Sequence, residues 1–291
     1  MSTYVRPASL DDALQLLAED GAVPMGGGTD LAGQVDRGIR SPATIVDLQD
    51  AGLGGIEAAG DGVRIGAAVT LAELAVAPLL EPYRAVTTAA SLAASPLLRN
   101  VGTVGGNLCQ HTRCWYYRGA EWHCWLGGGE TCYAQIGDHR KHGLEPGDCI
   151  SAHPSDLAPA LAACDAVVEV RARKRKPREL PLLDLYRRPT ADDRSLVTLR
   201  AGELVTAVRL PAPPDASAYE RLGERAAFSF PLVSVAAGRR GAETRVVAAG
   251  VANIPVALDP SDPLAGLKGS PQSAWKRRAL ATLVERALLG T

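Results

Sequence analysis

The stretch SPLLRNVGTVGGNLCQ at residues 95–110 decides how this chain is organised, because it carries a glycine loop within an apolar pattern. An earlier stretch, PMGGGTDLAGQ at residues 24–34, has the same character. Glycine adopts backbone conformations that bring N–H groups close to an anion, and successive N–H groups form a concave anion site. Each loop alone is better read as an ordinary tight turn. Together, the two loops favour a site that holds one pyrophosphate from both sides.

The common phosphate-binding motifs are absent. The chain contains no G-x-G-x-x-G, which excludes the usual Rossmann fingerprint, and no G-x-x-x-x-G-K-[ST], which argues against a P-loop nucleoside triphosphatase. The glycine loops therefore indicate a different kind of nucleotide site.

A cysteine-rich segment, RCWYYRGAEWHCWLGGGETCYAQIGDHRKHGLEPGDC at residues 113–149, follows the second loop. Thiolate sulfur binds zinc or iron–sulfur clusters, whereas structural zinc sites use closely spaced cysteine pairs. The wide spacing favours a [4Fe–4S] cluster, although zinc and free or disulfide-bonded thiols stay open as alternatives. The candidate ligands are Cys114, Cys124, Cys132 and Cys149. Cys109 and Cys164 are interpreted as small buried apolar residues.

The residues around these cysteines support a redox or metal site. All five histidines lie within 111–153, and six of the thirteen aromatic residues lie within 115–133. The aromatic rings would shield a cluster from water, which affects its potential. For each single histidine, a surface or hydrogen-bonding role is expected rather than ligation.

The composition excludes several classes of protein. The chain has 291 residues, of which 46% are hydrophobic and 22% charged, with a net charge of −1. These values describe a globular chain of two or three subdomains without electrostatic grounds for nucleic-acid binding. No apolar run is long enough to span a membrane, and no signal peptide is recognised. We therefore expect a cytoplasmic protein whose thiols are ligands rather than disulfides; export with a signal-bearing partner stays open.

The order of expected elements is typical of an α+β fold. Capping residues predict helices that begin after Ser9 and Thr70, and alternating apolar residues predict strands at 63–69, 203–210, 217–222, 231–239 and 244–251. A helix is expected over 155–164 and another over 273–289. The basic, proline-containing run at 171–181 predicts a linker.

These motifs together resemble the FAD-binding medium subunit of the molybdenum hydroxylases, the xanthine dehydrogenase and carbon monoxide dehydrogenase family. The resemblance rests on GGGTDL at 26–31, NVGTVGGNL at 100–108, HPSDLAPAL at 153–161, GELVTAVRLP at 202–211 and YERLGERAAFSFPLVSVAAG at 219–238. The cysteine segment is similar to an insertion in the branch of 4-hydroxybenzoyl-CoA reductase and periplasmic aldehyde oxidoreductase. In that branch the insertion carries a [4Fe–4S] cluster.

The resemblance implies a particular fold and site. The fold would be a two-lobed FAD-binding domain of the PCMH/vanillyl-alcohol-oxidase type, with lobes at 1–52 and 53–174, an iron–sulfur insertion at about 109–150, and a C-terminal α+β domain at 178–291. Arg221 stands where many members have lysine near the flavin. The FAD-binding residues that the motifs imply are Met25, Gly26, Gly27, Gly28, Thr29, Asp30, Leu31, Thr103, Gly105, Gly106, Asn107, Asp156 and Arg221.

The resemblance also implies a function. The chain would be an oxidoreductase subunit that passes electrons from [2Fe–2S] clusters of a small subunit to an external acceptor. A molybdopterin-binding large subunit would complete a heterotrimer or a dimer of heterotrimers. Two alternatives stay open: a stand-alone flavin and iron–sulfur oxidoreductase, and a non-catalytic zinc-binding module that has lost its flavin.

Overall fold

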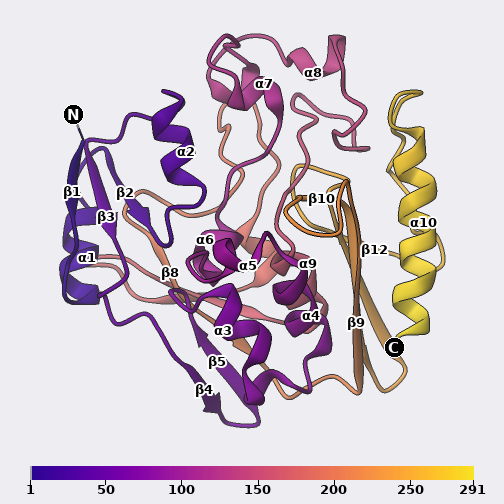
Figure 1. Ribbon diagram of the computed structural model, residues 1–291, viewed down its shortest axis with the longest axis horizontal. Coiled ribbons are helices and arrows are strands. Elements are labelled where there is room, and N and C mark those ends of the chain that lie inside the picture. The colour runs from indigo at the N-terminus through magenta and orange to yellow at the C-terminus, as the bar shows by residue number, and fades with distance from the viewer. Residues whose placement is uncertain (1) are drawn as a thin grey trace.

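The computed structural model describes residues 2–291, whose strands form three sheets joined by short helices (Figure 1). The N-terminal sheet lies at one side of the molecule and the C-terminal sheet, covered by the last helix, at the opposite side. The central helices lie between them, and the cysteine-rich insertion projects above these helices. Among the described residues, no helix is both long and apolar enough to cross a bilayer.

The N-terminal sheet is parallel and has the strand order β1-β3-β2. Its strands are β1 (Thr3–Val5), β2 (Ala22–Met25) and β3 (Thr44–Asp47), and its helices are α1 (Leu10–Leu17) and α2 (Leu31–Asp36). Helix α1 buries Ala13, Leu14 and Leu17 against Val46 of β3. This packing fixes the end of β2, from which the first glycine loop departs.

The central sheet is antiparallel, with the strand order β4-β5-β8-β6-β7. Its strands are β4 (Ile56–Ala59), β5 (Gly62–Gly66), β6 (Val167–Arg171), β7 (Arg178–Pro181) and β8 (Leu204–Leu210). The associated helices are α3 (Leu71–Val76), α4 (Arg84–Leu92), α5 (Pro96–Arg99), α6 (Val104–Leu108) and α9 (Leu157–Ala163), with 3₁₀ turns at Pro78–Leu80 and Leu182–Leu185. Helix α9 is buried over its whole length, so it forms the centre of the largest apolar core.

The insertion and the C-terminal part complete the chain. The insertion is irregular, with only α7 (Trp115–Arg118), a 3₁₀ turn at Trp125–Gly127 and α8 (Tyr133–Ile136). The C-terminal sheet is antiparallel, in the order β12-β11-β10-β9. It comprises β9 (Ala216–Gly223), β10 (Pro231–Arg240), β11 (Glu243–Ala249) and β12 (Val256–Leu258), and α10 (Ala274–Leu289) packs on it.

Sequence signals of short range are confirmed by the structure. The Ser9 hydroxyl accepts from the N–H of Asp12 at 3.2 Å, and Thr70 and Glu73 form both halves of a capping box. The linker predicted at 171–181 is wrong, because β6 and β7 pair there as a hairpin whose turn places Lys174 at φ 57°. The domain boundary predicted between 174 and 178 lies in this turn, and the three-part division of the chain stays a proposal.

Candidate functional site

The two glycine loops touch each other, and the contact requires glycine. A Cβ atom at Gly27 would overlap the carbonyl group of Val101, and one at Gly26 would overlap the side chain of Thr103. The first loop follows β2, and the second forms the start of α6, with Thr103 as its N-cap and Gly105 and Gly106 in its first turn. Their direct contact brings two segments about 75 residues apart into one site, as the sequence predicts.

The backbone N–H groups of the two loops have different roles. In the second loop, the N–H of Gly105 donates to the carbonyl of Ala67 at 2.8 Å, and that of Gly106 to the hydroxyl of Thr103 at 3.2 Å. Within residues 2–291, the N–H groups of residues 26–30 have no such acceptor. Unpaired backbone donors need a partner, so the first loop is the one that is free to bind an anion.

The loops line a cavity of about 420 Å³, a volume typical of cofactor and ligand sites. The sequence-predicted residues in its wall are Met25, Gly26, Gly27, Gly28, Thr29, Asp30, Leu31, Thr103, Gly105 and Gly106. The structure thus brings together most of the predicted FAD-binding set. Asn107, Asp156 and Arg221 do not line this cavity.

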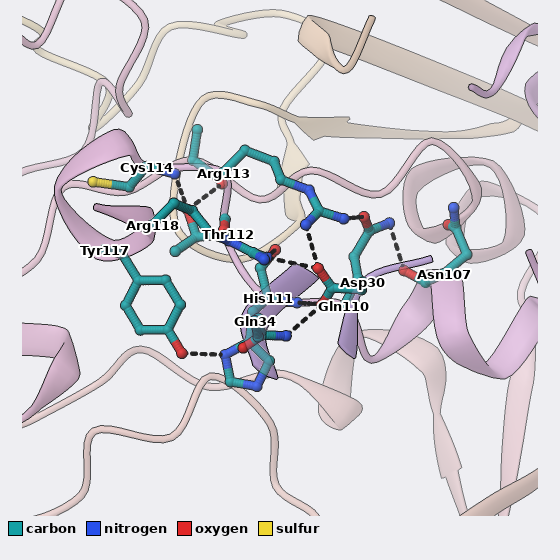
Figure 2. A network of polar contacts seen from close by, with 11 residues as sticks. Asp30, Gln34, Asn107, Gln110, His111, Thr112, Arg113, Cys114, Tyr117 and Arg118 are labelled. Atoms are coloured by element: carbon teal, nitrogen blue, oxygen red, sulfur yellow. Dashed lines mark hydrogen bonds and ion pairs between the residues drawn. The ribbon is translucent and has the colours of Figure 1, made fainter. Parts of the chain in front are cut away.

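Asp30 connects the cavity to the cysteine-rich insertion (Figure 2). Its carboxylate forms ion pairs with Arg113 and with Arg118, the latter at 2.7 Å, and accepts from the backbone N–H of His111 at 2.9 Å. Burial raises the pKa of Asp30, but the two arginines outweigh it and hold the pKa below its ordinary value. Asp30 is therefore ionised, and its oxygen atoms are already occupied by the chain itself.

The remaining three predicted residues belong to polar contacts outside the cavity wall. Tyr219 donates to Asp156 at 2.6 Å, and the guanidinium of Arg221 lies 3.5 Å from the same carboxylate. Burial raises the pKa of Asp156 to about 6, against the opposing effect of Arg221. The side chain of Asn107 accepts from Ser155, which precedes Asp156 in the chain, at 2.6 Å. These groups join α6, α9 and β9.

The four candidate cysteine ligands converge on a small pocket of their own. Cys114, Cys124, Cys132 and Cys149 line it together with aromatic side chains that include Tyr116, Tyr117, Trp125 and Tyr133. Among the described residues, no three His, Cys, Asp or Glu side chains are close enough to share a single metal ion. A zinc ion holds its sulfur ligands at about 2.3 Å from one centre, so the thiols share a pocket without forming a mononuclear site.

The thiols of this pocket differ in their surroundings. A hydrogen bond with the Cys149 thiol lowers the pKa of Cys132 to about 6, and the same bond together with burial raises the pKa of Cys149. Burial raises the pKa of Cys114 to about 11. The other two cysteines lie outside this pocket. Cys164 is fully buried, as predicted, whereas Cys109 is half-buried in the wall of the large cavity.

The family can be assigned from the sequence. Residues 1–213 match the family model described as the FAD binding domain in molybdopterin dehydrogenase. The chain belongs to this family. The aldehyde oxidoreductase FAD-binding subunit PaoB of Escherichia coli strain K12 is 37% identical to it over 257 residues, which cover 86% of this chain and 81% of that protein. The protein is therefore an FAD-binding subunit of an oxidoreductase.

More distant relatives agree with this assignment. The carbon monoxide dehydrogenase medium chain of Afipia carboxidovorans is 28% identical over 263 residues, covering 87% of this chain and 75% of that protein. In a solved structure of the Cu,Mo-CO dehydrogenase, a chain 21% identical superposes with a TM-score of 0.74 over 99% of this chain and 96% of that chain. A chain of quinoline 2-oxidoreductase from Pseudomonas putida 86 superposes with a TM-score of 0.70 at 19% sequence identity. The superposition covers 99% of this chain and 96% of that chain. These structures show that the fold is shared.

Several residues of the cavity wall are not predicted from the sequence. Arg40, Gln34 and the segment 195–205 line the cavity with the glycine loops. The amide oxygen of Gln34 is buried and has no partner among the described residues, which marks it as an acceptor for a ligand donor. Residues 202–205 belong to the motif at 202–211, but nothing in that motif indicates that it faces the cavity, and residues 195–200 have no recognisable motif.

Proposed function

We propose that this FAD-binding subunit also carries a [4Fe–4S] cluster and is the electron-transfer subunit of a multi-subunit molybdenum hydroxylase. One observation carries the proposal: four cysteines from a 36-residue stretch converge on one pocket, and Asp30 ties that stretch to the FAD loop. FAD exchanges one or two electrons when bound. The chain's own task is to position both groups and to shield them from water.

The first glycine loop fits the pyrophosphate of FAD. Its free N–H groups at 26–30 supply donors, and the absence of side chains at Gly26 and Gly27 lets it lie against the second loop. Thr103, Gly105 and Gly106 would form the opposite wall. The other three residues of the predicted set either contact parts of FAD that extend beyond the cavity or hold α6, α9 and β9 together. These residues are Asn107, Asp156 and Arg221.

The cysteine pocket fits a cluster better than a single ion. A [4Fe–4S] cube binds each thiolate through a different iron, so its ligands surround a common space without meeting at one point. The aromatic side chains of the pocket would limit solvent access, which is one of the factors that set a cluster's potential. Cys114, Cys124, Cys132 and Cys149 are the proposed ligands, and membership of the branch with this insertion is part of the proposal.

The proposed partners are a molybdopterin-binding large subunit and a small subunit with [2Fe–2S] clusters, in a heterotrimer or a dimer of heterotrimers. The names of the relatives support this, since they are designated FAD-binding subunits or medium chains. Electrons from the [2Fe–2S] clusters would leave through this subunit to an external acceptor. The substrate would be set by the large subunit, and the proposed location is the cytoplasm.

The test is co-purification of the native complex under anaerobic conditions, with iron, sulfide, FAD and molybdenum analysis of each chain. We expect FAD and about four irons in this chain and molybdenum in a partner. An active chain that purifies alone would replace this proposal with a stand-alone oxidoreductase. Zinc without iron in this chain would contradict the cluster.

A further inference from the structure

A buried lysine fastens the insertion to the C-terminal helix. Lys276 of α10 is fully buried, and its Nζ donates to the backbone carbonyls of Lys141, His142 and Gly250 at 3.0, 2.9 and 2.5 Å. These three bonds use all the donors of an ammonium group. Because a buried charge is costly unless it is fully hydrogen-bonded, this geometry specifies where the backbone of residues 141–142 lies.

The residue fixed in this way points at one of the proposed cluster ligands. The Nε2 atom of His142 lies 3.2 Å from the Sγ atom of Cys114. The residue His142 is 2% exposed, and the ring of Trp115 packs edge to face against its imidazole with the centroids 4.7 Å apart. The imidazole therefore has little freedom to turn away from the sulfur.

The two ring nitrogens of this imidazole have different surroundings. The Nδ1 atom is buried without a partner in the described chain. A proton on Nδ1 would leave a buried N–H donor without an acceptor, whereas a proton on Nε2 can be donated to the sulfur. The Nε2–H tautomer is thus favoured.

We infer that His142 tunes the proposed cluster by donating its Nε2–H to the Cys114 thiolate, with Lys276 holding the imidazole in position. The inference rests on the proposed function, because it needs Cys114 as a ligand. A hydrogen bond to a ligand sulfur stabilises the more negative, reduced cluster and so raises its potential. His142 is a positioning and tuning residue, and it is not a ligand.

The test is an EPR-monitored redox titration of the purified complex carrying His142→Phe or His142→Gln. The phenylalanine variant keeps a ring without a donor, and glutamine keeps an N–H donor. The matched control is His123→Phe, since His123 belongs to the same insertion but is exposed. We expect His142→Phe to shift the one-electron reduction equilibrium about tenfold toward the oxidised cluster, a change of 59 mV to lower potential. His142→Gln should recover part of the shift, and His123→Phe should leave the potential unchanged.

Each outcome decides the matter. An intact cluster with an unshifted potential in His142→Phe would overturn the inference. Loss of the cluster from His142→Gln would also overturn it, because His142 would then be needed to build the site rather than to tune it. Iron and sulfide are measured in the unsubstituted complex first. If iron and sulfide are absent from the unsubstituted complex, the proposed cluster itself is contradicted. FAD content and thermal unfolding show whether each variant is folded.

Discussion

Gly27→Ala tests whether the contact between the glycine loops builds the FAD site. The backbone of Gly27 is outside the left-handed region, so the substitution adds no conformational strain. The loss of stability comes from the new methyl group, which would overlap the carbonyl group of Val101. Backbone cannot rotate away as a side chain can, so the loops must separate. Overpacking of this kind costs about 1–3 kcal/mol of stability.

The effect on FAD binding follows from the same displacement. The N–H groups at 26–30 are the free donors of the cavity, and a hydrogen bond to a charged group contributes about 1.5–3 kcal/mol. Loss of one such bond would weaken binding about 10- to 100-fold, since about 1.4 kcal/mol corresponds to a factor of ten. The assay is fluorescence titration of the flavin-free protein with FAD, together with thermal unfolding of the same sample.

The matched control is Gly33→Ala. Gly33 lies within α2, six residues along the chain, and an added Cβ there meets nothing within 4 Å. Alanine in a helix interior should stabilise the protein by about 1 kcal/mol and leave the affinity for FAD unchanged. If folded Gly27→Ala protein bound FAD as tightly as the Gly33→Ala control, the reasoning about the interlocked loops would be refuted.

Further predictions concern the Asp30 network, acid stability and the cysteines. Asp30→Asn should lower the free energy of unfolding by about 2 kcal/mol, less than the 3–5 kcal/mol of a fully buried pair because the groups are partly exposed; chemical denaturation measures it. Burial lowers the pKa of His111 to about 4 and of His153 to about 3. Below about pH 6.5 the unfolded chain binds protons that the folded chain does not, so stability should fall by about 2–3 kcal/mol per histidine between pH 6.5 and 4.5. Cys124→Ser should remove iron and sulfide while FAD stays bound, whereas Cys164→Ser should keep both cofactors, as metal and flavin analysis would report.

These predictions have clear contradictory outcomes. An unchanged denaturation midpoint for Asp30→Asn would mean that the ion pairs contribute nothing to the fold. A flat stability profile from pH 7 to pH 4.5 would show that His111 and His153 titrate as exposed side chains do. Undiminished iron in Cys124→Ser would remove Cys124 from the ligand set.

The sequence predicts what is local in this protein. The caps at Ser9 and Thr70 depend on residues three positions apart, and the structure confirms both. The long strands of the C-terminal sheet have enough alternating residues to be recognised. The hairpin at 171–181 has no sequence signal, because its polar turn contains no glycine and Lys174 takes the left-handed conformation instead.

What depends on distant contacts could not be predicted. The glycines at 105 and 106 suggest free N–H groups, yet these groups bond within the chain. Asp30 belongs to a motif expected to face FAD, but its ionic partners lie 83 and 88 residues away. The burial of Lys276 is equally hidden, because a lysine near the start of an amphipathic helix normally faces solvent.

The most direct test of the central claim is the cofactor content of this one chain. The complex would be purified anaerobically, its chains separated, and FAD, iron, sulfide and zinc measured per mole of each. The account predicts FAD with about four irons and as much sulfide in this chain, and a flavin absorption spectrum over a broad iron–sulfur background. FAD with no iron would contradict the claim that the cysteine pocket holds a cluster, and zinc without flavin would contradict the function as a whole.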